Sequence, residues 1–108
     1  MAPPSTDERT LRDACFDFER QLLDEERPAR VVTAVSWRLE HLVCPLIGHV
    51  KLADVDDELL RGFAAVLHRQ ELKEEATYTL QHLAWCLAAA GRELGSVELA
   101  LGLREEPF

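Results

Sequence analysis

The stretch 76-ATYTLQHLAWCLAAA-90 decides the fold, because fifteen consecutive residues carry no charge. At 3.6 residues per turn, Leu80, Leu83 and Leu87 lie on one face of a helix. A helix that is apolar nearly all round is buried on two sides. The stretch therefore predicts either the central helix of a bundle or a helix whose second face meets a partner. That second face holds Tyr78, His82, Trp85, Cys86 and Ala89.

The residues on either side complete this helix and predict another before it. Glu74 and Glu75 open the helix, where acidic side chains favour the positive end of its dipole, and Gly91 ends it. The preceding helix is expected to begin at a cap formed by Asp54 or Asp56. Its buried face consists of Leu59, Leu60, Phe63, Val66 and Leu67.

Two further helices are predicted in the N-terminal half. Thr10 is a suitable N-cap for a helix that ends near Asp24, with an apolar stripe at Leu11, Cys15, Phe18 and Leu22. The next helix runs from about Ala29 to Leu46, and Pro45 should bend or end its last turn because proline has no backbone donor. Gly48 then closes that helix, and residues 49–53 form an extended connection.

The tail has two possible structures. Val97, Leu99, Leu101 and Leu103 alternate as in a strand, whereas Leu94, Val97 and Leu101 keep helical spacing. A lone strand would have no partner, so we favour a short helix capped by Ser96. The sequence thus predicts an all-α fold with one domain over residues 10–108, a bundle of four helices and a possible short fifth. Residues 1–9, with Pro3 and Pro4, are expected to form a disordered lead.

The charge balance argues against nucleic-acid binding. The chain has 20 acidic and 12 basic residues and a net charge of -8, whereas DNA-binding proteins neutralise phosphates with clustered Lys and Arg. The charge instead indicates a basic partner or a role in solubility. No stretch reaches the roughly 20 apolar residues of a membrane span, and residues 1–10 do not have the pattern of a signal peptide. We therefore expect a cytoplasmic protein with no membrane partner.

The cysteines and histidines give two possibilities. Cys15, Cys44 and Cys86 are odd in number and lack close spacing, so reduced thiols are expected rather than disulfides. The pairs His41/Cys44 and His82/Cys86 would suit a zinc site if their helices faced each other. Buried cysteines with surface histidines are commoner, and we expect neither metal nor cofactor.

Nothing in the sequence indicates catalysis. The carboxylates lie at helix starts and on solvated faces, where capping explains them. The serines lie in no nucleophile elbow, and the chain has no glycine-rich phosphate loop. We therefore expect a protein that is not an enzyme and acts by binding.

Read in order, the helices resemble a known domain. The order 10-TLRDA-14, then Leu42, Pro45 and Gly48, is similar to the start of the SAM-like core-binding domain of tyrosine recombinases (phage-type integrases). The resemblance covers residues 10 to 92 and implies a four-helix, DNA-binding fold. Its later positions are Leu52, Asp54, Val55, Leu59, Phe63, Leu67, Leu72, Thr77, Leu80, Leu83, Leu87, Ala90 and Gly91.

The chain departs from that family in two ways. These 108 residues do not contain the Arg, His-x-x-Arg and nucleophilic Tyr of the family's catalytic domain, and Tyr78 cannot take the last role. The chain's helices also lack the family's basic surface. If DNA binding survives, the resemblance assigns it to Arg30, Arg38, Lys73 and Arg92. A third possibility is an acidic mimic of DNA that occupies another protein's basic groove.

The best functional prediction is a non-catalytic interaction module that accompanies or regulates a larger complex, which in this family would process DNA. Tyr and Trp are common anchors of protein interfaces. The candidate contact residues, for a homodimer or another protein, are Tyr78, His82, Trp85 and Ala89, together with Trp37.

Overall fold

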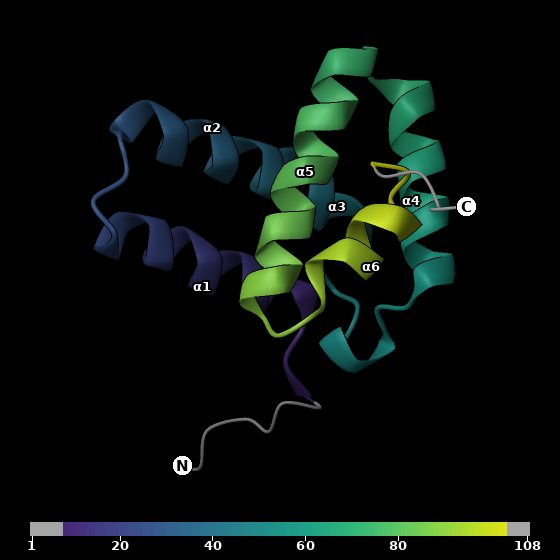
Figure 1. Cartoon of the computed structure of the whole chain (residues 1–108), viewed down its shortest axis with the longest axis horizontal. Coiled ribbons are helices and arrows are strands. Elements are labelled where there is room, and N and C mark those ends of the chain that lie inside the picture. The colour runs from purple at the N-terminus through teal and green to yellow at the C-terminus, as the bar shows by residue number, and fades with distance from the viewer. Residues whose placement is uncertain (1–7, 104–108) are drawn as a thin grey trace.

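The uncharged stretch forms α5 (Lys73–Ala89), and the other helices pack around it (Figure 1). The structure is a computed structural model and describes residues 8–103. Helices α1 and α2 form an antiparallel hairpin on one side of α5, and α4 and α6 lie on the other. The all-α prediction is confirmed. Helix α5 is packed by other helices on two sides, but Tyr78 and Trp85 of its second face stay half exposed, so a contact between that face and a partner stays a prediction.

The hairpin begins at the predicted cap. Helix α1 (Leu11–Asp24) starts at Thr10, whose side chain accepts a hydrogen bond from the Asp13 backbone, while the Asp13 carboxylate accepts one from the Thr10 backbone. This reciprocal pair satisfies two of the free amides of the first turn. The chain reverses at Glu26, which has a positive φ of 55°, and α2 (Ala29–Arg38) runs back along α1.

Pro45 does not end the second helix but changes its hydrogen bonding. A π-helical turn, η2 (Leu39–Val43), follows α2 and leads directly into α3 (Cys44–Ile47). In this turn the Cys44 amide donates to the Leu39 carbonyl, five residues back. A proline in an unbroken α-helix would clash with the carbonyl four residues before it. The wider turn accommodates the ring, so the predicted disturbance takes the form of a π-turn.

The connection after α3 is hydrogen-bonded to the start of α1. Its carbonyls at Gly48 and Val50 accept hydrogen bonds from the amides of Arg12 and Leu11, at 2.9 and 2.8 Å. These amides belong to the first turn of α1, which has no partners within the helix. The predicted extended segment is therefore only partly extended: Lys51 forms a bridge with Thr10, and η3 (Leu52–Asp54) is a 3-10 turn.

The last three helices follow the predicted order. Helix α4 (Asp57–Gln70) is capped by Asp56, which accepts from the Leu59 amide at 2.8 Å. Gly91, with φ 104°, ends α5, and the tail is the helix α6 (Leu94–Ala100) rather than a strand. The predicted cap at Ser96 is wrong, because the helix starts two residues earlier and the Ser96 hydroxyl bonds to the Glu93 carboxylate.

The domain includes Arg9, one residue before the predicted boundary. Its carbonyl accepts from the Leu52 amide at 2.8 Å, and its side chain pairs with Asp17. The rest of the predicted disordered lead, residues 1–7, lies outside the described residues, as do residues 104–108 of the predicted domain.

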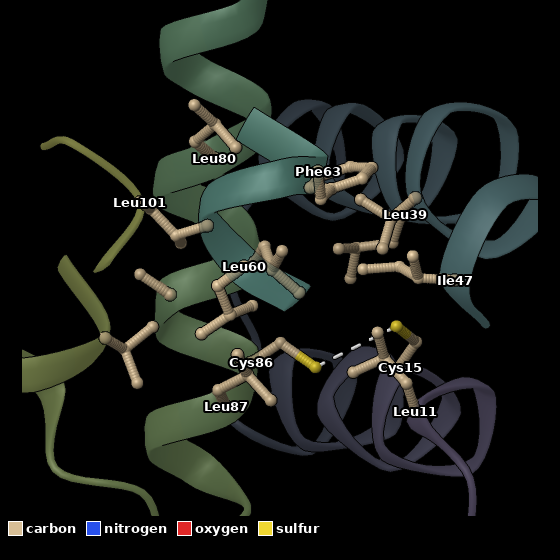
Figure 2. Close-up of a cluster of buried hydrophobic side chains, with 14 of the residues drawn as sticks. Leu11, Cys15, Leu39, Ile47, Leu60, Phe63, Leu80, Cys86, Leu87 and Leu101 are labelled. Atoms are coloured by element: carbon tan, nitrogen blue, oxygen red, sulfur yellow. Dashed lines mark hydrogen bonds between the residues drawn. The ribbon is translucent and has the colours of Figure 1, made fainter. Parts of the chain in front are cut away.

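Among residues 8–103 every α-helix contributes to one apolar core, part of which is drawn in Figure 2. Leu80, Leu83 and Leu87, the predicted inner face of α5, are fully buried in it. Burying one such side chain contributes about 1.5–3 kcal/mol, so this face contributes much of the stability. Within residues 8–103, no helix combines the length and the apolar character needed to cross a membrane.

Gly48 allows the close approach of α3 and the connection. A Cβ at this position would lie 2.7 Å from the Cys44 carbonyl oxygen and 2.8 Å from the Cys44 Cα. We expect Gly48→Ala to lower the free energy of unfolding by about 1–3 kcal/mol, because the backbone must shift. Gly62→Ala in α4 is the matched control: an added Cβ there has no atom within 4 Å, so the variant should gain up to about 1 kcal/mol from helix propensity. Thermal melts of both would contradict this account if Gly48→Ala melted like the wild type.

Candidate interaction surface

Three large aromatic side chains lie half exposed on α2 and α5. The exposed fraction is 51% for Trp37, 54% for Tyr78 and 44% for Trp85. Tyr78 and Trp85 are two turns apart on one face of α5, and Ala89 continues that face and is exposed. We call Trp37, Tyr78 and Trp85 the aromatic surface.

Arg38 joins the two helices beneath this surface. Its Nε and Nη2 atoms donate to the Glu75 carboxylate, each at 3.3 Å, and its guanidinium carbon lies 5.3 Å from the centroid of the Tyr78 ring. Arg38 thus forms a bidentate ion pair with Glu75 and a cation–π contact with Tyr78. It holds the Tyr78 ring in place and cancels the charge of Arg38, so this part of the molecule is locally neutral.

Trp37 is positioned by its own helix. The His41 ring stacks on it with the centroids 5.0 Å apart, and His41 Nδ1 donates to the Trp37 carbonyl at 3.0 Å. His41 is the third residue of the π-turn. In a helix, such a carbonyl normally accepts a hydrogen bond from a backbone amide of the next turn. Here the His41 side chain donates to the Trp37 carbonyl. The large indole is thus supported on one side and open on the other.

His82 is placed differently from the other predicted contact residues. Only 8% of it is exposed, and its ring lies 5.5 Å from that of Trp85. Burial, and to a lesser degree the positive charge of Arg38, lower the pKa of His82 from 6.5 to about 4. Its Nδ1 has no hydrogen-bonding partner among residues 8–103. His82 therefore supports Trp85 from below as a neutral ring, rather than offering its own surface.

The pKa of His82 predicts an acid-sensitive fold. Between pH 6.5 and about 4 the unfolded chain binds a proton that the folded His82 does not, so stability falls as the pH falls through this window. We expect His82 to account for a loss of about 2 kcal/mol, by order of magnitude. The measurement is urea unfolding at several pH values for the wild type and His82→Gln, since other groups also titrate there.

The matched control is His41→Gln, because His41 is exposed. It should retain the acid sensitivity of the wild type, while His82→Gln should lose part of it. Equal slopes of stability against pH for all three proteins would show that His82 is not the buried titrating group.

Glu19 is a second buried group near the hairpin. Burial raises the pKa of this carboxyl, the Ser36 hydroxyl opposes that shift, and the neighbouring Glu40 carboxylate adds to it. One oxygen of Glu19 has no hydrogen-bonding partner among the described residues. This buried carboxyl is therefore a cost to the packing of α1 on α2.

The three cysteines, distant in sequence, meet in the core. Cys15 of α1 and Cys86 of α5 have their sulfur atoms 3.9 Å apart, pointing toward one another in Figure 2, and Cys44 of α3 also contacts Cys15. Helical spacing predicts Cys86 on the second face of α5, whereas its side chain is buried against Cys15. The one signal of the cluster was that Cys15 lies on the apolar stripe of its helix.

The structure does not bring the pairs His41/Cys44 and His82/Cys86 together as a zinc site. Cys44 and Cys86 point inward to Cys15, and His41 stays outside on Trp37. Among residues 8–103 no group of three or more His, Cys, Asp or Glu side chains is arranged to hold a metal ion. All three thiols are free and buried. The contact with Cys15, and then burial, raises the pKa of Cys44. The contact with Cys44 lowers the pKa of Cys15, but the contact with Cys86 and burial outweigh it, so that pKa is raised as well.

We expect these thiols to be unreactive in the folded protein, because the thiolate is the nucleophile and burial suppresses it. A water-soluble thiol reagent should label none of Cys15, Cys44 and Cys86 in buffer and all three in urea, as counted by mass spectrometry. The rate in buffer should follow the rate of unfolding. Rapid labelling of a single cysteine under native conditions would contradict this packing.

The four basic residues assigned to DNA binding do not form a free basic patch. Arg38 is paired with Glu75, and Arg92 donates to the carbonyls of Leu52 and Val55, the latter at 2.7 Å. Arg30 and Lys73 are exposed, at the N-terminal ends of α2 and α5. These ends lie apart, one at the turn of the hairpin and the other beside α4 (Figure 1).

Comparisons with protein-family models, with curated proteins and with solved structures found no match to this chain.

Proposed function

We propose that the chain is a non-catalytic interaction module that binds a second copy of itself through the aromatic surface. The observation that supports this most is the combination of three half-exposed aromatic side chains with locally neutral charge. Tyr and Trp are enriched in the energetic centres of interfaces.

The charge balance restricts where a second copy can bind. Two chains with a net charge of -8 repel each other over most of their surface. They can approach where charges are cancelled, and the Arg38–Glu75 pair makes the region beside Tyr78 such a place. A two-fold contact would bring the same surface from each copy together.

A hollow beside Trp85 supplies a place for a partner's side chain. It has a volume of about 370 Å³ and lies between the two helices of the hairpin and α5. Phe18 and Leu22 line it from α1, and Val31 and Val35 from α2. An aromatic ring that enters such an apolar hollow loses its contact with water, which is the environment of interface hot spots.

The wider role follows from the resemblance to recombinase core-binding domains. We propose that the dimer acts in the cytoplasm as an accessory or regulator of a larger complex, of the DNA-processing kind. The acidic charge and the engaged Arg38 and Arg92 favour protein contacts over direct DNA contacts. Salt-dependent binding of duplex DNA that is lost in Arg30→Glu would favour the integrase-like alternative instead.

We expect Trp85→Ala to weaken the dimer by about 2 kcal/mol, or roughly thirtyfold in Kd, because the hot-spot ring is removed. The measurement is light scattering over a concentration series. The matched control is Leu23→Ala: Leu23 is 63% exposed on α1, outside the aromatic surface, and its truncation should leave the dimer unchanged. Circular dichroism of both variants should retain the helical signal.

A wild type that stays monomeric at every concentration would contradict this function. It would also be contradicted if Trp85→Ala unfolded the protein while light scattering showed no increase in the mass of the wild type with concentration. The indole would then serve the fold alone.

A further inference from the structure

A second surface, formed by helices other than those of the aromatic surface, is a groove between α3 and α4. Its volume is about 650 Å³, within the range of ligand-binding clefts. Leu46 and Ile47 line one side from α3. The side formed by α4 consists of Leu59, Gly62, Phe63 and Val66. Leu46 is 41% exposed, so the groove offers apolar surface to solvent.

Carboxylates also line this groove. They belong to Asp54, Asp56 and Glu58, and Asp57 follows Asp56 in the chain. Between residues 8 and 103, none of these acids takes part in an ion pair. Three of these acids lie at the positive N-terminal end of α4, where Asp56 accepts a backbone hydrogen bond, but no basic side chain among the described residues pairs with them, so the groove is negatively charged.

Gly62 shows that the groove is kept open at a cost to the helix. It lies in the middle of α4, where glycine is less favourable than alanine by about 1 kcal/mol. Its φ is not positive, and a Cβ there would have no atom within 4 Å. Neither backbone conformation nor packing thus requires glycine, in contrast to Gly48. What the missing side chain does provide is space on the floor of the groove.

From these observations we propose that the groove binds an amphipathic helix of a partner protein, with apolar residues on one face and Lys or Arg on its flanks. The apolar side chains of such a helix, spaced by three or four residues, enter the space above Gly62 between Leu46 and Val66. Its basic flanks lie against Asp54 and Glu58. A second copy of this chain fits poorly, because its own surface is acidic.

The test uses the full chain and a synthetic probe, a peptide of about 16 residues, long enough to form a helix. The peptide has Leu on one face and Lys on the other, with a fluorescent label, and its control has Glu in place of every Lys. Fluorescence anisotropy should show binding of the Lys peptide in the micromolar range and none of the Glu peptide. Raising the salt from about 50 mM to about 500 mM should weaken the complex, because exposed charges are screened.

Two pairs of variants locate the site. Gly62→Leu should fill the groove and weaken binding by at least about tenfold, while raising the melting temperature through helix propensity. Gly62→Ala should bind more nearly like the wild type. The double variant Asp54→Asn/Glu58→Gln should bind about three- to tenfold more weakly, and Glu93→Gln, outside the groove, should bind normally. Asp56 is left intact because it caps α4.

The proposal is overturned if the Lys peptide does not bind, if the Glu peptide binds equally well, or if Gly62→Leu binds as the wild type does. It is also overturned if Gly62→Leu dissociates a dimer of this chain, since the occupant would then be a second copy. Trp85→Ala should leave peptide binding unchanged, so failure here and failure of the aromatic surface can be told apart.

Discussion

The absence of charge from residues 76–90 is the constraint on which the rest of the structure depends. A helix with no charged face cannot lie at the edge of a bundle without exposing apolar surface. Helix α5 is consequently enclosed by the α1–α2 hairpin and the π-turn on one side and by α4 and α6 on the other. Each of these helices needs only one apolar face, which is the amphipathic pattern that they have.

The helices leave apolar side chains exposed in two regions, and these regions are the two candidate binding surfaces. On α2 and α5, Trp37, Tyr78 and Trp85 stay half exposed. Arg38 joins the two helices by pairing with Glu75. Where α3 and α4 do not close over one another, an apolar groove that carboxylates also line stays open. The first region is neutral and the second is charged, so they suit partners of different chemistry.

The sequence was sufficient to predict the helices, because their apolar spacing and caps are local signals. Thr10, Asp56 and Gly91 each act where predicted. It was insufficient for the candidate sites, because these depend on how the helices are rotated against one another. The two-face description of α5 put His82 and Cys86 together with Trp85, yet the first two are buried. Only the position of α1 decides that Cys86 faces Cys15, and the groove beside Gly62 depends on α3, beyond the reach of any single-helix pattern.

The central place of α5 also has a consequence for the order in which the protein is made. Synthesis proceeds from the N-terminus, and domains fold as their residues emerge. Here the helix against which α1, α2 and α4 pack is encoded after all three of them. The apolar surface that these helices bury against α5 therefore stays exposed until residue 89 has left the exit tunnel of the ribosome. During that interval, repulsion between the acidic residues of neighbouring chains opposes aggregation through these exposed faces.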